Sequence, residues 1–267
     1  MLLDIAQLLI GLAWNLLLVG VLFSLLEWAM PARPAQRRLR PRWATDLMFF
    51  LGQQLLFGGG VTLLLGWLSG ALEQGSGLSV LRRSYAAQPL WLQTLIAVTL
   101  GDMLMYWGHR LQHRYELLWR FHAVHHTSEH LDFLAAYREH PLDGLYTQTL
   151  MNLPAIVLGL RVEAVLGVIT FRSLWAIFIH SNVRLPLGPL RMLFGAPELH
   201  HHHHARDREA GNYANLAPWI DWLFGTYHLP AAGPAPIGIR EPHPRGYLAL
   251  LWYPFSPRRQ AEEATAP

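Results

Sequence analysis

Histidine is the residue type that could carry chemistry in this sequence, because it occurs 15 times in 267 residues and gathers in three clusters. His109 and His113 form the first cluster, in the spelling HRLQH. On an α-helix this spacing puts both imidazoles on one face, about 40° apart around the axis. An i, i+4 pair is the usual way in which a helix offers two imidazoles to one metal ion. We therefore predict a metal site at this pair.

Two further clusters share the spacing HxxHH. On a helix, the three rings of such a box lie on one side. Pro197 and Glu198, just before the second box, suit the first turn of a helix. One box alone could be a solvated helix face, but three clusters in one chain indicate metal binding. The first box is His122, His125 and His126, and the second is His200, His203 and His204.

The second box lies inside an unbroken run of five histidines, His200 to His204. Such a run could be an expression tag, a loose metal-binding stretch or part of a built site. A tag normally lies at a terminus, whereas this run lies in the last third of a chain that continues coherently on both sides. The HxxHH spacing fits the run in only one register, with His200, His203 and His204. On a helix His202 points nearly opposite that face and His201 lies at its flank, so we predict that His202 is a spacer.

The number of histidines indicates two metal ions. A tetrahedral zinc ion is saturated by four ligands, while imidazole-rich sites of higher coordination number suit iron. The chain has no cysteine, which excludes thiolate zinc sites and cysteine-ligated iron–sulfur clusters. His140 and His180 are further candidate ligands, although a lone histidine is more often a hydrogen-bonded structural residue.

Asp102 and Tyr106 fall on the same helical face as His109 and His113, two turns and one turn before the pair. A carboxylate on this face could accept the N–H of a ligand ring and fix its tautomer. We therefore predict that both residues support the metal ligands.

The composition indicates a membrane protein. Hydrophobic residues make up 52% of the chain and charged residues only 15%, whereas a soluble domain has about a quarter charged. Apolar spans run from about 2 to 28, 47 to 72 and 90 to 107. A fourth region, about 145–180, is interrupted by GLRVEA and is typical of a helical hairpin. The predicted fold is all-α: a polytopic membrane helical bundle with a cytosolic histidine-rich metal-binding cap.

Five arginines crowd the segment between the first two spans, which predicts a cytoplasmic loop. With that loop inside, the third span delivers His109 to the cytoplasm and the hairpin keeps the later histidines there. The chain is thus expected to be an integral, multi-pass protein of the cell inner membrane, with no nucleic-acid partner. The arginines are Arg33, Arg37, Arg38, Arg40 and Arg42.

Three regions are expected along the chain. Residues 1–100 form N-terminal transmembrane helices and loops. Residues 101–228 form a histidine-box catalytic region that includes the membrane hairpin. Residues 229–267 form a polar C-terminal tail whose charged end is expected to be disordered.

The three boxes stand in an order and wording that resemble the fatty acid hydroxylase/sterol desaturase superfamily, a group of integral-membrane non-haem di-iron oxygenases. The wording is YWGHRLQHRYELLWRFHAVHH and, later, NYANLAPWIDWLFGTY. The resemblance covers about 101–227, half of the chain. It implies that the histidines of the three boxes bind the metal. His180 matches a further family histidine, and His140 lies in an Arg-x-x-His-Pro signature.

The resemblance also marks residues after the last box. Asn212 and Tyr213 fall on the Asn-Tyr element of the superfamily, and Asp221 is a further candidate for supporting the ligands. Two positions depart from the pattern: Ala214 stands where glycine is usual, and Ile220 precedes Asp221 where tryptophan is common. These departures leave the subfamily open.

The resemblance implies a lipid-modifying enzyme with two iron ions and O2 as co-substrate. It would hydroxylate or desaturate a C–H bond of a fatty acyl, sterol or related lipid held in the bilayer. The reducing equivalents would come from an external electron donor, a separate electron-transfer protein such as a ferredoxin or a cytochrome with its reductase.

Two other classes of function have to be weighed. A metal transporter or metal-buffering membrane protein should carry its ligands near the midplane of the membrane, whereas these histidines lie at and beyond the span ends. A hydrolytic zinc enzyme would want a glutamate base beside the ligands. Glu116, Glu129 and Glu139 are near, but none lies in an HExxH motif.

Overall fold

The computed structural model describes residues 2–75, 77–230 and 235–257, and within these ranges the chain is helical without a β-strand. This confirms the predicted all-α class. Three one-turn 3-10 helices, Ala135–Tyr137, Gly188–Met192 and Tyr253–Phe255, join longer elements. The α-helices are α1 (Leu2–Ala29), α2 (Trp43–Gly52), α3 (Gly58–Gly75), α4 (Ser79–Ala86), α5 (Leu90–Arg114), α6 (Glu116–His126), α7 (Pro141–Leu158), α8 (Val162–His180), α9 (Pro197–His203), α10 (Trp219–Leu223) and α11 (Tyr247–Trp252).

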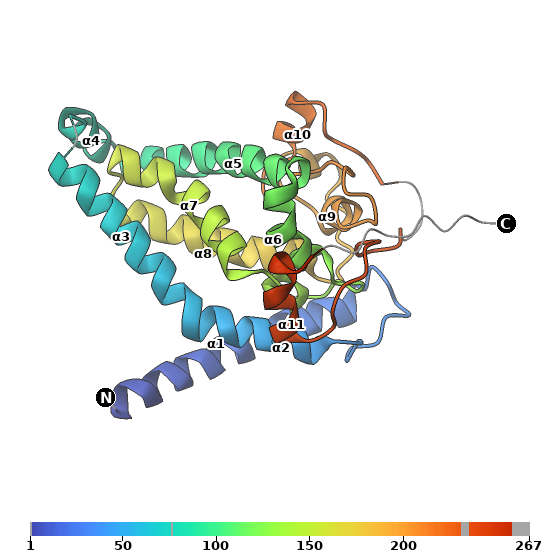
Figure 1. The fold of residues 1–267 in the computed structure, drawn as a ribbon. Helices are drawn as coiled ribbons and strands as arrows, with labels where there is room; N and C mark the ends of the chain where they lie inside the picture. The colour runs from blue at the N-terminus through green and yellow to red at the C-terminus, as the bar shows by residue number, and fades with distance from the viewer. Residues whose placement is uncertain (1, 76, 231–234, 258–267) are drawn as a thin grey trace.

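The long helices α1, α3, α5, α7 and α8 form a bundle, and the short helices α6, α9, α10 and α11 gather at one end of it (Figure 1). The last turns of α5 and α8 reach the same end, whereas α4 joins α3 to α5 at the opposite end. All three histidine clusters therefore lie at one end of the bundle, as the span assignment predicted.

Three helical stretches are long and apolar enough to cross a membrane: Ile10–Ala29, Trp43–Gln74 and Val162–His180. They correspond to the first two predicted spans and the second limb of the hairpin. α5 and α7 form where the third span and the first limb were predicted, but neither is among the three. The reason is that α5 carries polar side chains, among them Gln93, Asp102 and Gln112, which it buries against its neighbours.

The hairpin reverses at Gly159, as the GLRVEA interruption predicted. This glycine has a φ of 63°, the left-handed conformation that commonly ends a helix. The N–H of Leu160 donates to the carbonyl of Ala155 at 3.0 Å, so the last turn of α7 is closed. α8 then returns toward the histidine end and delivers His180 there.

A π-helical turn, Gln53–Phe57, interrupts the apolar stretch between α2 and α3. π-turns insert one extra residue into a helix and frequently occur at functional sites. Here the turn carries Gln53 and Gln54, which line the cavity beside the histidines, and the Gln53 amide donates to the carbonyl of Tyr137 at 3.0 Å.

A buried ion-pair network ties the arginine-rich segment to the loop between α6 and α7. Arg40, one of the five arginines of the predicted cytoplasmic loop, is buried, and it donates two hydrogen bonds of 2.6 Å to the carboxylate of Asp132. Asp46 accepts from both Arg40 and Arg138. The network fixes Arg138, whose backbone carbonyl belongs to the site described below.

Part of the predicted C-terminal tail packs against the histidine region. Ile239 is buried against Trp119 and Ala123, and Leu250 of α11 is buried against Val124 and Phe49. The charged end expected to be disordered, 258–267, lies outside the described residues. The division into three regions remains a prediction.

Candidate metal centre

The structure gathers nine histidines into two buried groups. In each group, every histidine offers a ring nitrogen within 4.8 Å of those of the other members. The rings come from two parts of the chain, the neighbouring helices α5 and α6 and, more than 50 residues later, the end of α8 and the α9 segment. Group 1 is His109, His113, His122, His126 and His203, and group 2 is His125, His180, His200 and His204.

Each HxxHH box is shared between the two groups. In the first box the i, i+4 pair joins group 1 and the middle histidine, His125, joins group 2. In the second box the i, i+4 pair joins group 2 and the middle histidine, His203, joins group 1. Each box thus spans both groups, so the groups lie side by side; the rings of His126 and His204 stack with centroids 4.3 Å apart.

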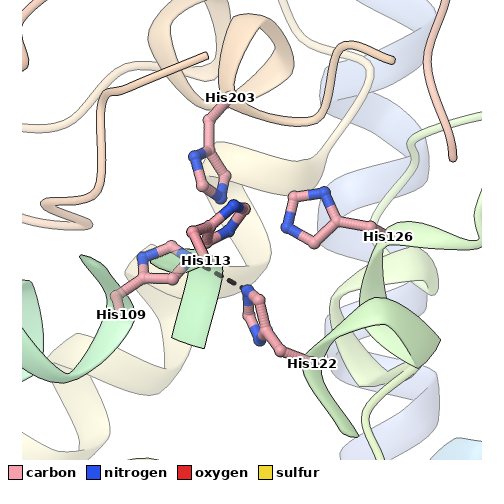
Figure 2. A group of neighbouring side chains, drawn as sticks. All are labelled: His109, His113, His122, His126 and His203. Carbon is pink, nitrogen blue, oxygen red and sulfur yellow. Dashed lines mark hydrogen bonds between the residues drawn. The ribbon is translucent and has the colours of Figure 1, made fainter. Parts of the chain in front are cut away.

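Local helix geometry aims the rings of group 1 at a common centre (Figure 2). One extended residue, Tyr115, separates α5 from α6, so that α6 runs in a new direction and its pair faces the pair of α5. α9 adds His203 from above this pair of helices. It is a seven-residue helix with Pro197 in its first turn, as predicted.

In group 1, the ring nitrogen that faces away from the centre donates to a backbone carbonyl in three cases. The Nδ1–H of His109 donates to Tyr213 at 2.7 Å, and that of His113 donates to Arg208 at 2.6 Å. The Nδ1–H of His203 donates to Gly211 at 2.8 Å. Such bonds fix the tautomer and leave Nε2 with a free lone pair for a metal ion.

In group 2, two rings likewise donate from Nδ1 to a backbone carbonyl. The Nδ1–H of His125 donates to the carbonyl of Arg138 at 2.9 Å. The Nδ1–H of His180 donates to the carbonyl of Ala176, one turn earlier in α8, at 2.6 Å. The Nε2 atoms of His180 and His200 lie 2.9 Å apart, and those of His200 and His204 lie 3.1 Å apart.

The fixed tautomers make the two groups fit for a metal. His109 and His122 both donate through Nδ1, so their Nε2 atoms, 3.0 Å apart, both carry bare lone pairs. The same holds for His125 and His180, whose Nε2 atoms are also 3.0 Å apart. Two lone pairs cannot hydrogen-bond to each other, and a cation between them removes the repulsion. In addition, the buried Nε2 atoms of His113, His126 and His203 have no hydrogen-bond partner among the described residues.

Burial keeps these imidazoles neutral. It lowers the pKa of His122 to about 3 and that of His125 to about 4. It lowers the pKa of His109, His113 and His203 well below the ordinary value, with the neighbouring histidines acting in the same direction. Since only an unprotonated nitrogen binds a metal, the rings are ready for ligation at neutral pH.

One carboxylate contacts a ring of the groups, and the sequence prediction missed it. Asp143, in the first turn of α7, accepts from Nδ1 of His122 at 3.0 Å through one oxygen. Its other oxygen accepts from the side-chain amide of Gln112 at 2.5 Å. Burial raises the pKa of Asp143 to about 6, while His125 and Gln112 hold it down, so the carboxylate is largely ionised at neutral pH.

We predict that Asp143→Asn lowers metal affinity and activity by about 10- to 100-fold, the usual effect of losing a carboxylate bonded to a ligating histidine. The asparagine keeps the shape of the site but removes the charge that favours the Nδ1–H tautomer of His122. Iron per chain and lipid oxidation by the purified protein measure the effect. The matched control is Asp207→Asn, at an exposed carboxylate outside both groups. Full iron retention in Asp143→Asn would contradict the role given to this residue.

Asn212 shapes the turn that holds two rings. Gly211 and Asn212 both have positive φ values, 76° and 53°, in which glycine is unstrained and asparagine is tolerated. The Asn212 side chain bonds to the backbone of Leu199 and His228. The turn thereby presents the carbonyls on either side of Asn212, those of Gly211 and Tyr213, to one ring each.

Asp221 and Tyr106 brace the same turn. The carboxylate of Asp221 accepts from the backbone N–H groups of Tyr213 and Ala214, both at 2.8 Å, and from the Thr226 hydroxyl at 2.7 Å. The Tyr106 hydroxyl lies 2.9 Å from the Thr226 hydroxyl. Both residues therefore reach the ligands through the backbone.

Asp102 was predicted to support a histidine ring, but it pairs with an arginine instead. It accepts from Nη2 of Arg172, on α8, at 2.9 Å and contacts no ring of either group. The reason is that backbone carbonyls already occupy the Nδ1 atoms of His109 and His113, which leaves no ring N–H for this carboxylate.

His140 lies outside both groups. Its Nδ1 accepts the N–H of Leu142 and so caps the start of α7, and its Nε2 contacts the carbonyl of Leu251 at 3.1 Å. A ring with both nitrogens engaged by the backbone has no lone pair left for a metal ion. The structure thus favours a structural role for His140, whereas it brings the other nine candidate ligands together.

The two spacers within the histidine run also lie outside the groups. The His202 ring faces His228, with centroids 6.3 Å apart. His201 has a structural contact that its predicted place at the flank of the helix did not indicate. Its Nε2 donates to the carbonyl of Ser181 at 3.1 Å and so links α9 to the end of α8.

A cavity of about 490 Å³ adjoins both groups. His109 and His122 of group 1 line it, together with His125, His180 and His200 of group 2. The rest of its wall comes from the long helices α1, α5, α7 and α8, from the π-turn, from the segment 136–139 and from Asn215. A molecule in this cavity would therefore meet both groups from the side of the apolar helices.

Glu139 is the carboxyl group in the wall of this cavity. Burial and the neighbouring Asp143 raise its pKa to about 8, so it carries its proton at neutral pH. Its oxygens accept from the Thr147 hydroxyl at 3.3 Å and from the Gln53 amide at 3.4 Å. A neutral, hydrogen-bonded carboxyl group leaves this wall compatible with an apolar molecule.

The chain is similar to lipid-modifying enzymes. A family model described as fatty acid hydroxylase matches residues 94–226. Ornithine lipid hydroxylase OlsE from Rhizobium tropici is 34% identical over 181 residues, 65% of this chain and 54% of the relative. Alkylglycerol monooxygenase from Danio rerio is 31% identical over 166 residues, 58% of this chain and 35% of the relative. Very-long-chain aldehyde decarbonylase GL1-11 from Oryza sativa subsp. indica is 30% identical over 151 residues, 54% of this chain and 57% of the relative.

The chain matches between about a third and just over half of the length of these relatives. No solved structure matches the chain significantly. The matched region of the family model contains all nine histidines of the two groups and also Asn212 and Asp221.

Proposed function

Because this chain belongs to the fatty acid hydroxylase/sterol desaturase superfamily, we propose that it is a membrane-bound di-iron oxygenase that uses O2 to oxidise a C–H bond of a lipid. The observation that carries the proposal is the pairing of bare Nε2 lone pairs in two adjacent buried groups. Each group then holds one ion.

Iron fits the donor set better than a tetrahedral zinc ion. Ring nitrogens that would hold one ion together must lie about 3 Å apart. The closest pairs in group 2 are separated by 2.9 to 3.1 Å. Group 1 offers five imidazoles, one more than a tetrahedral zinc ion takes, and imidazole-rich sites of higher coordination number suit iron. The ions, when bound, supply the activation of O2 that attack on an unactivated C–H bond requires.

The protein would position the lipid and the histidine rings and exclude water from the site. Residues of α1, α7 and α8 line the cavity together with histidines of both groups, so a lipid chain bound there would lie against the apolar helices and reach both groups. The rings are fixed from behind by carbonyls of Tyr213 and Arg138 and by the carboxylate of Asp143, which limits their reorientation.

We propose hydroxylation of a lipid as the reaction. Of the relatives named above, one is a hydroxylase of an ornithine lipid and one is a monooxygenase of an alkylglycerol. Both names describe insertion of oxygen, which supports hydroxylation over desaturation for this chain. Both also name a lipid with a polar end.

The reducing equivalents would come from a separate electron-transfer protein, a ferredoxin or a cytochrome with its reductase. We place the histidine end at the cytoplasmic side of the inner membrane. The arginine-rich segment supports this orientation, because the backbone N–H of Arg33 donates to the side chain of Asn182, two residues after His180. The metal-transporter reading finds no comparable support, since the groups lie at the end of the bundle.

We predict that the purified protein holds two iron ions and forms a lipid product one oxygen atom heavier only when O2 is present. Removing iron with a chelator abolishes the product, and adding ferrous iron restores it. Elemental analysis and comparative lipidomics of cells with and without the protein are the measurements. Stoichiometric zinc with O2-independent hydrolysis of a lipid would overturn the proposal.

A further inference from the structure

A small chamber with a mixed apolar and polar lining adjoins the cavity. It has a volume of about 90 Å³ and lies between α5, α7, α8 and the loop that carries Asn215. Met105, Gln148 and Ser173 line both spaces, so the chamber is a direct neighbour of the cavity that adjoins the histidine groups. A volume of this size exceeds what one ordered water needs.

Four side chains that line the chamber each have a buried polar atom with no hydrogen-bond partner among the described residues. Two of these atoms are acceptors, Oδ2 of Asp102 and Oδ1 of Asn215. The other two are donors, Nε of Arg172 and Nε1 of Trp175. Buried polar groups in native proteins are almost always satisfied, so atoms of this kind around one space indicate a ligand or water in it.

The Asp102–Arg172 pair gives the chamber no net charge. Nη2 of Arg172 donates to Oδ1 of Asp102 at 2.9 Å and to the carbonyl of Val98 at 2.6 Å. Gly101 makes room for the guanidinium, because a Cβ there would lie 2.7 Å from Nη1. Arg172 belongs to α8, one of the helices apolar enough to span a membrane, and an ionisable residue in such a helix marks a functional site by default.

The chemistry of the free atoms defines the ligand class. A group that satisfies two acceptors and two donors must itself both donate and accept, as hydroxyl groups do. A lone anion would be repelled by Asp102, and a lone cation would be repelled by Arg172. An uncharged diol meets both conditions.

We propose that this chamber binds an uncharged, hydroxyl-bearing end of the lipid substrate; the proposal rests on the function proposed above. Met105 lies one helical turn from His109, and Asp102 lies about 10 Å from it along the axis of α5. A lipid anchored in the chamber therefore presents to the histidine groups a carbon several bonds away from its hydroxyl groups. The chamber would set which position of the chain is oxidised.

The test compares four probes with an unbranched chain of sixteen carbons: hexadecylglycerol, palmitate, hexadecylamine and hexadecane. Their competition with tritiated hexadecylglycerol is measured on the iron-loaded protein in nanodiscs under argon, so that no turnover occurs. Hexadecylglycerol should bind at least about tenfold more tightly than the others. Asn215→Leu and Asp102→Asn should each weaken its binding by about tenfold and leave hexadecane unchanged.

Asn215→Leu leaves the Asp102–Arg172 pair intact, so it remains informative if Asp102→Asn fails to fold. The matched control is Thr62→Val, on an exposed face of α3 away from both spaces, which should bind all four probes as the wild type does. Equal affinity for hexadecane and hexadecylglycerol, tightest binding of a charged probe, or undiminished diol binding in Asn215→Leu would overturn the inference. Protein that oxidises lipids but shows no diol preference would refute the chamber alone, whereas protein without iron and oxidation would refute the proposed function.

Discussion

Replacing His203 by alanine should abolish lipid oxidation, and replacing its neighbour His202 should leave it nearly unchanged. His203 is buried in group 1, its Nδ1 is held by the Gly211 carbonyl, and its Nε2 has no partner among the described residues. The His203 variant therefore removes one of the five rings that we propose to hold a metal ion and leaves a buried gap there. His202 is partly exposed and belongs to neither group, so its loss costs the site nothing.

The measurement is product formation and iron content in the two purified variants, together with their circular dichroism. The comparison is matched, because the two residues have the same type and adjoin in the same short helix. We expect His203→Ala to keep its helical content while losing iron from group 1. If both variants behaved alike, whether active or inactive, the histidine run would be a loose metal-binding stretch rather than part of a built site.

That the histidines of the three boxes gather could be predicted because helical periodicity is a local property. The spacing of His200, His203 and His204 fixes which rings share a helix face before any tertiary structure is known. The division of each box between two groups was not predictable in the same way. It depends on where α8 places His180 and on how α6 meets α9, and these are contacts between distant parts of the chain.

The residues that support the ligands were only partly predictable. Asn212 and Asp221 could be named from the family resemblance. Their hydrogen bonds to backbone N–H and carbonyl groups could not be predicted, because every residue carries such groups. Nothing in the sequence marked Asp143 as a partner of a histidine ring, because an acidic residue in the first turn of a helix is common. Asp102 lies on the predicted face, yet the chain pairs it with Arg172, 70 residues later.

Replacing Asp46 by alanine should destabilise the protein by about 3–5 kcal/mol, the usual cost of leaving a buried charge without its partner. Asp46 is completely buried and accepts from Arg40 and Arg138. Arg40 would keep the carboxylate of Asp132, but Arg138 would keep only the Thr127 hydroxyl among the described side chains. The effect should reach the metal centre, because the carbonyl of Arg138 holds the ring of His125.

The matched control for Asp46→Ala is Glu198→Ala, which removes an exposed ion pair with Arg191 at 3.1 Å. Exposed pairs contribute about 0–1 kcal/mol, so the control should unfold almost as the wild type does. Chemical unfolding in mild detergent measures both variants, and iron content separates local from global damage. If Asp46→Ala were as stable as Glu198→Ala but bound less iron, the network would serve to hold Arg138 for His125. Equal stability with full iron content would mean that neither the fold nor group 2 depends on this network.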